Sequence, residues 1–158
     1  MESTYVNIMI QSLHKKVKVL EEIKSLNLLQ KALLEDERAN VEDFDKTVED
    51  KSDCIKQLEQ LDDGFDLLFA KVKEAINADK AAYADRIRTM QDLIRQITDL
   101  SMEIQAQESR NKDLMTRKFV SVKERAKVVR TNTKVANQYY KNMMNLHYVD
   151  PQFMDNKK

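Results

Sequence analysis

Residues 83–115 read YADRIRTMQDLIRQITDLSMEIQAQESRNKDLM. Mostly apolar positions recur in this stretch at alternating steps of four and three residues. This is the heptad spacing of a helix that packs along its whole length. We predict one long helix here, in which polar Glu108 and Asn111 occupy packed positions and fix the register, with a ligand role as the alternative. The recurring positions are Tyr83, Ile87, Met90, Ile94, Ile97, Ser101, Ile104, Glu108, Asn111 and Met115.

Two stripes with similar spacing precede this stretch and predict two further helices. The first helix is expected over about residues 5–37, with a slip in phase after Leu20, and the second over about residues 41–76. Gly64 is interpreted as a kink within the second helix, because the apolar phase continues across it. Asn40 and Asp79 are the predicted N-caps of the second and third helices. The first stripe comprises Val6, Ile10, Leu13, Val17, Leu20, Leu26, Leu29 and Leu33. The second comprises Val41, Phe44, Val48, Lys51, Ile55, Leu58, Phe65, Leu68, Val72 and Ile76, of which Lys51 is the one charged member.

The heptad pattern also continues downstream, after a stutter between Met115 and Phe119. Nothing between residues 80 and 145 stops a helix, which at ~1.5 Å per residue gives a length of about 95 Å. Antiparallel pairing about a turn at residue 78 places the partner of Val41 near Met115, so the third helix is expected to overhang. The predicted fold is all-α, an elongated antiparallel bundle or coiled coil of three long helices. Its parts are a body (1–115), a basic amphipathic arm (116–145) and a flexible C-terminal tail (146–158).

The composition excludes several classes of protein. The 158 residues include one Gly, one Pro and one Cys, so Gly-rich phosphate loops and dinucleotide-binding turns, which need several glycines, are ruled out. Cys54 has no second cysteine to pair with, which favours a reducing compartment. No apolar run is long enough to span a membrane, and the N-terminus lacks the pattern of a signal peptide. We expect a cytoplasmic protein without stable membrane insertion.

The net charge of zero conceals a strong separation of charge. Residues 116–142 hold eight cations and one acid, a net charge of +7, whereas residues 35–66 hold 13 acids and four cations, a net charge of −9. The arm also carries an apolar stripe that no other predicted helix covers, so we expect it to fold back, to pair with another copy or to bind a partner. A partner helix suits anchors at heptad spacing better than nucleic acid or a membrane surface does, because the cations are scattered and the stripe is thin.

Residues with catalytic or metal-binding potential form no recognisable pattern. His14 and His147 lie at opposite ends of the chain, and neither follows a Glu by three residues, so the di-iron Glu-x-x-His pattern is absent. Cys54 is interpreted as a packing residue. We therefore expect no enzymatic activity, no cofactor and no metal.

Four segments of the chain share features with a known family of proteins. They are Leu33-Leu34-Glu35-Asp36-Glu37-Arg38, Asn40-Val41-Glu42-Asp43-Phe44, Lys51-Ser52 with Ile55-x-x-Leu58-x-x-Leu61, and Glu103-Ile104-Gln105-x-x-Glu108-x-x-Asn111-x-x-Leu114. With these segments, the chain resembles the FlgN-type flagellar export chaperones. The resemblance covers most of the chain.

This resemblance implies a cytoplasmic chaperone that binds hook-associated proteins of the hook–filament junction and delivers them to the type III export apparatus. In that family the C-terminal helical region holds the client, which here corresponds to the arm. A FliT-type filament-cap chaperone and a structural coiled-coil adaptor that forms a homodimer through the arm are the alternatives. The expected partner-binding residues are Phe119, Val122, Arg125, Val129, Arg130, Lys134, Tyr140 and Met143.

Overall fold

The structure is a computed structural model, and it describes residues 4–118. These residues form only helices and turns, in the order α1 (Thr4–Glu35), α2 (Val41–Asp62), α3 (Phe65–Ala78), the short 3-10 helix η1 (Ala81–Tyr83) and α4 (Ala84–Lys118). The prediction of an all-α helical bundle is confirmed. The arm beyond Lys118 and the tail lie outside the described residues, so the predicted division of the chain into three parts stays a prediction.

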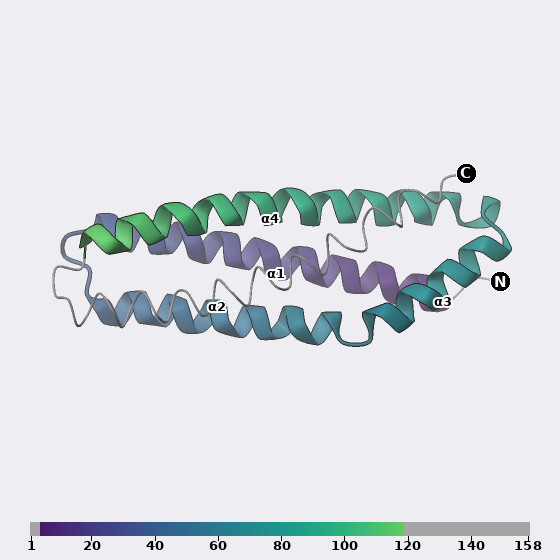
Figure 1. The fold of residues 1–158 in the computed structure, drawn as a ribbon, viewed down its shortest axis with the longest axis horizontal. Coiled ribbons are helices and arrows are strands. Elements are labelled where there is room, and N and C mark those ends of the chain that lie inside the picture. Colours follow the sequence, from purple (N-terminus) through teal and green to yellow (C-terminus); the bar gives the residue numbers. More distant parts are fainter. Residues whose placement is uncertain (1–3, 119–158) are drawn as a thin grey trace.

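Helix α1 is the element on which the others pack. It contacts α4, α2 and α3, and Figure 1 shows it between α2 and α4 along the length of the molecule. Helix α2 runs antiparallel to α1, while α4 returns in the same direction as α1. The parallel pairing of α1 with α4 is also seen in two side-chain contacts, from Lys24 to Glu103 (3.1 Å) and from Asn27 to Gln107 (3.1 Å). The core is therefore arranged around α1.

The buried stripe of α1 keeps one phase from end to end. Beyond Leu20 it continues through Ile23, Asn27, Gln30 and Leu34, so the predicted slip to Leu26, Leu29 and Leu33 is wrong. Leu29 is 48% exposed, whereas Asn27 and Gln30 are fully buried. The prediction followed the leucines and was wrong because polar residues occupy the core positions in this part of α1. Its positions are Val6, Met9, Leu13, Lys16, Leu20, Ile23, Asn27, Gln30 and Leu34.

The packed positions of the remaining helices follow the predicted stripes. Of the residues expected at packed positions in α2 through α4, Val41, Leu68 and Ile87 are half-buried, and the others are buried. Asn40 caps α2 as predicted, because its side-chain oxygen accepts a hydrogen bond from the backbone N–H of Asp43 at 2.9 Å. The predicted N-cap at Asp79 is wrong, because Asp79 is the C-cap of α3 and the third long helix, α4, begins only at Ala84. The side chain of Asp79 accepts a hydrogen bond from the N–H of Ala82 at 3.3 Å within the turn between the two helices.

Gly64 separates two helices, so the prediction of a kink within one helix is wrong. Its φ of +73° lies in the left-handed region, where glycine has no steric penalty, and α3 begins at the next residue. Lys16 of α1 holds both sides of this break. Its ammonium group lies 2.7 Å from a carboxylate oxygen of Asp62 at the end of α2 and 4.0 Å from the centre of the Phe65 ring. The apolar phase continues across the break because both helices pack on α1.

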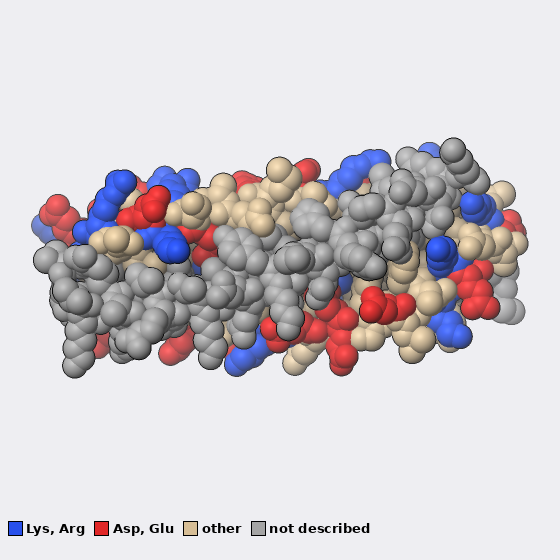
Figure 2. Space-filling view, in the orientation of Figure 1, with Lys and Arg blue, Asp and Glu red and all other residues tan. Residues whose placement is uncertain are grey.

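Acidic residues dominate the second helix. Between residues 41 and 62, eight acids and three lysines give α2 a net charge of −5. On the face shown in Figure 2, acidic side chains gather along the lower edge, where α2 passes into α3 in the same view. This edge is a negative surface.

We expect replacement of Gly64 by alanine to lower the free energy of unfolding by about 1 kcal/mol, because the left-handed conformation strains any residue with a Cβ atom. No atom lies within 4 Å of the position that the Cβ would occupy, so backbone strain is the sole expected cost. Gly64→Asn is the matched control, since asparagine tolerates this conformation better. Urea denaturation measures both variants, and equal losses for alanine and asparagine would contradict this explanation.

Candidate functional site

Ten polar side chains of residues 4–118 are buried, and we call the seven that form hydrogen bonds between α1, α2 and α4 the polar band. All are buried, with exposed fractions of 5% or less. They come from α1, α2 and α4, so the band connects the three longest helices. Its members are Asn27, Gln30, Thr47, Lys51, Gln107, Glu108 and Asn111.

One half of the band joins α2 to both of the other helices. The ammonium group of Lys51 donates to the carboxylate of Glu108 on α4 and, at 3.3 Å, to the side-chain oxygen of Gln30 on α1. The amide of Gln30 in turn donates to the hydroxyl of Thr47 at 3.0 Å. Lys51 therefore links all three helices through charged and polar contacts.

The other half of the band joins α1 to α4. The amide of Asn27 donates to the side-chain oxygen of Gln107 at 3.1 Å, and Gln107 donates to the carbonyl of Lys24 at 3.3 Å. Asn111 donates to the carbonyl of Asn27 at 2.9 Å. These bonds are directional, so they fix the relative height of the two helices where apolar packing alone would allow sliding.

The charges of the band are held at an energetic cost. Burial lowers the pKa of Lys51 below its ordinary value, and the adjacent carboxylate of Glu108 opposes that shift. A buried pair of this kind contributes little net stability, but either charge left alone in the core costs several kcal/mol. The band therefore favours one arrangement of the helices over others more than it strengthens the fold. This agrees with the register role predicted for Glu108 and Asn111.

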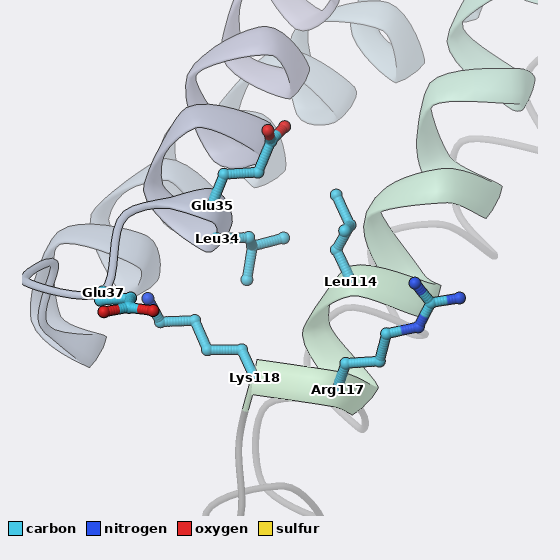
Figure 3. A pocket seen from close by; sticks show the side chains of 6 residues that line it. All are labelled: Leu34, Glu35, Glu37, Leu114, Arg117 and Lys118. Carbon is cyan, nitrogen blue, oxygen red and sulfur yellow. The ribbon is translucent and has the colours of Figure 1, made fainter.

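A pocket of about 430 Å³ lies at the end of the bundle where α4 ends. Figure 3 shows Leu34 of α1 and Leu114 of α4 on its two sides, with Glu35, Glu37, Arg117 and Lys118 around them. Lys118 reaches across to the end of α1, where its ammonium group donates to the carbonyls of Leu33 (3.2 Å) and Asp36. A cation at the C-terminal carbonyls of a helix is favourable, and this contact holds the end of α4 beside the end of α1.

The described residues offer little for chemistry. Burial raises the pKa of the Cys54 thiol to about 12, with a further contribution from the Glu22 carboxylate, so this thiol is protonated and inert at neutral pH. Within residues 4–118, no three His, Cys, Asp or Glu side chains are grouped to hold a metal ion. In the same range, none of the helices is both long enough and apolar enough to cross a membrane.

The predicted partner-binding residues fall beyond Lys118, outside the described part of the chain, so their role stays a prediction. They are Phe119, Val122, Arg125, Val129, Arg130, Lys134, Tyr140 and Met143. Sequence reasoning placed Lys51, Glu108 and Asn111 at packed positions but missed Lys16, Asn27 and Gln30. The signal was present, since these three continue the alternating spacing of α1.

Comparison with known families identifies the class of protein. The model of a family described as FlgN protein matches residues 1–145. The chain belongs to the FlgN family. Searches among curated proteins and among solved structures gave no match.

Membership of the FlgN family makes the chain a chaperone of flagellar assembly, whose partners are flagellar proteins. The match agrees with the FlgN-type resemblance of the sequence segments quoted above. It extends 27 residues beyond Lys118, so the family pattern includes the whole predicted arm.

We expect Lys51→Met to lower the free energy of unfolding by about 3–5 kcal/mol, because the buried Glu108 carboxylate loses its counter-charge. The double variant Lys51→Met/Glu108→Leu removes both charges at similar volume and should recover most of that loss. Urea denaturation of both single variants and the double variant gives the coupling energy. Additive effects of the two substitutions would contradict the proposed energetic role of this pair.

Proposed function

We propose that this chain is a cytoplasmic chaperone for hook-associated proteins, which it binds through residues 116–145 and delivers to the flagellar type III export apparatus. The observation that carries the proposal is the family match, which includes this whole segment and not the body alone. The segment combines an apolar stripe at heptad spacing with a large excess of positive charge. Such a pattern suits the binding of a partner helix.

The organisation of the body supports this choice of interface. The apolar stripes of α1 through α4 are largely buried within the bundle. Among the described residues, the exposed large apolar side chains are distributed over α1, α3 and α4. They are Tyr5, Ile8, Leu28, Leu29, Leu67 and Met102. The stripe of the segment is therefore the better candidate for a continuous client-binding surface.

The proposed mechanism is the formation of an intermolecular helical bundle. The apolar anchors pack against an amphipathic helix of the client and prevent self-association of the client before export. Arg125, Arg130 and Lys134 attract acidic clients over a distance and increase the rate of association. The chaperone acts through binding alone, without catalysis or a cofactor. The anchors are Phe119, Val122, Val129, Tyr140 and Met143.

We expect Phe119→Asp/Val129→Asp to weaken binding of a hook-associated protein by at least about 100-fold, because burial of each anchor contributes ~1.5–3 kcal/mol. Isothermal titration with the purified client measures the loss, and far-UV circular dichroism checks that the helices of the body are retained. The matched control is Leu28→Asp/Met102→Asp, which introduces the same charges at exposed apolar positions of the body and should leave affinity unchanged.

Two results would contradict the proposal. Binding that survives the Phe119/Val129 substitutions, or that the control abolishes instead, would place the client on the body. A tight homodimer that binds no hook-associated protein and dissociates on substitution of Phe119 and Val129 would identify a coiled-coil adaptor. Light scattering during size-exclusion chromatography distinguishes the dimer from a complex of chaperone and client.

A further inference from the structure

The outward side of α1 changes character toward the C-terminal end of the helix. Between residues 14 and 22, the exposed residues are polar or charged: His14, Lys15, Lys18, Glu21 and Glu22. Between residues 25 and 32, the exposed residues are uncharged: Ser25, Leu28, Leu29 and Ala32. The helix on which the others pack therefore presents an uncharged, mostly apolar surface over about two turns.

Two leucines form most of this surface, and two more extend it toward α2. Leu28 is 50% exposed and Leu29 is 48% exposed, although leucine is usually buried. Leu26 and Leu33 are half-buried. With Glu22 and Leu29 they follow steps of four, three and four residues, so these four residues share one side of α1. We call the whole surface the leucine face; it comprises Ser25, Leu26, Leu28, Leu29, Ala32 and Leu33.

Packing within the described bundle does not explain this surface. The core stripe of the same turns runs through Ile23, Asn27, Gln30 and Leu34. Within residues 4–118, α3 and α4 each expose a single large apolar side chain, Leu67 and Met102. Single exposed apolar residues are common, whereas adjacent ones on one surface mark an interaction site.

Acidic residues border the leucine face on α1. Glu21 and Glu22 precede it, and Glu35 follows it as the next exposed residue of the helix. Glu35 is 3.7 Å from Lys31, but both side chains are exposed, and exposed ion pairs of this kind are weak. Both ends of the face are therefore available to a basic partner.

Helix α2 adds acids along one edge of the leucine face. Cys54 interacts with Glu22, and Thr47 is bonded to Gln30, so the side of α2 that holds Cys54 and Thr47 borders α1. Asp50 lies between these two contacts, and Asp43 lies one turn beyond Thr47 on the same side. The edge of the leucine face that borders α2 is therefore acidic.

We propose that the leucine face is a docking surface for a basic amphipathic helix of a second protein. Leucines at steps of three and four residues suit a helix that lies along α1 and packs its own apolar residues against them. Lysine or arginine along the edges of that helix would meet the acids of α1 and α2. The surface is on the body, so the proposal goes beyond the client binding assigned to residues 116–145 and does not depend on it.

Two other occupants are less complementary in charge. A second copy that packs antiparallel on the leucine face, with the two-fold axis between Leu28 and Leu29, would place Glu22 opposite Glu35. These like charges repel each other. An anionic membrane surface would be repelled by the same acids, and it requires a longer apolar face than two turns. A basic protein helix is the occupant that the surrounding charges favour.

The polar band holds this surface in one arrangement. Asn27 and Gln30 belong to the same turns of α1, and they are bonded to Gln107 of α4 and Thr47 of α2. The relative height of α1 and α2 is thereby fixed, so the leucines of α1 and the acids of α2 keep their positions. A surface that is already ordered loses less entropy when a partner binds.

Fluorescence anisotropy of a labelled peptide with the full chain tests the proposal. The probe is an amphipathic helix of about 18 residues, or five turns, with leucines on one face and lysines along both edges. The comparison peptide has glutamate in place of each lysine. We expect saturable binding of one lysine peptide per chain and binding of the glutamate peptide that is at least about tenfold weaker.

Substitutions on the leucine face locate the binding site. Leu28→Ser/Leu29→Ser should weaken binding of the lysine peptide at least about tenfold, because both side chains lose an apolar contact. The matched control is Leu67→Ser/Met102→Ser, which changes residues that are 69% and 61% exposed and should leave the affinity unchanged. Phe119→Asp/Val129→Asp should also leave it unchanged, so this result is independent of client binding. Far-UV circular dichroism checks the helical content of each variant.

Each other outcome overturns the docking. A lysine peptide that does not bind, equal binding of the two peptides, or binding that survives Leu28→Ser/Leu29→Ser would show that the leucine face does not select a basic helix. Loss of binding in Phe119→Asp/Val129→Asp would place the peptide on the client-binding segment. A homodimer that Leu28→Ser/Leu29→Ser dissociates would assign the face to a second copy, and anionic vesicles that bind the chain but not this variant would assign it to a membrane surface.

Discussion

The buried contact between Lys51 and Glu108 requires α2 and α4 to be held at fixed heights on either side of α1. Neither helix packs along the other, so their relative position depends on the surface that α1 presents to each of them. On that surface, Gln30 contacts Lys51 and Asn27 contacts Gln107, which places polar partners at the same level of the bundle. A shift of α4 by one turn would separate the charges by about 5 Å and leave both unpaired in the core. The polar band therefore selects one register of the bundle.

A flagellar chaperone requires a surface that binds a client and a body that stays folded while the client binds and is released. In this chain the two requirements are met by different parts. The body buries its apolar stripes around α1 and is closed at one end by Lys118, which donates to the last carbonyls of α1. Client binding is proposed for the segment that follows.

The sequence predicted the helical class, the cap at Asn40 and the packed positions of α2 and α4, because periodic apolar residues and side-chain caps are local signals. It failed in α1, where three of the core positions are the polar residues Lys16, Asn27 and Gln30. Asn27 and Gln30 are fully buried, whereas Leu29 is half exposed. A search for apolar residues alone cannot identify buried positions that are polar. The break at Gly64 was also missed, because the apolar phase is continuous across it and only the positive φ of glycine ends the helix. The sequence predicted only some members of the polar band, because bonded partners in the band are 17 to 84 residues apart and no local pattern pairs them.

The measurement that tests this account most directly is amide hydrogen exchange of the full chain, alone and with a bound hook-associated protein. Amides that open only on global unfolding exchange most slowly, so the middle of α1, which the other helices cover, should exchange most slowly and α3, beyond the break at Gly64, faster. Binding of the client should change exchange within residues 119–145 and leave the middle of α1 unchanged. Slow exchange in α3 together with rapid exchange in α1 would contradict a body arranged around α1. A client that changes exchange in α1 and leaves exchange in residues 119–145 unchanged would contradict client binding by that segment.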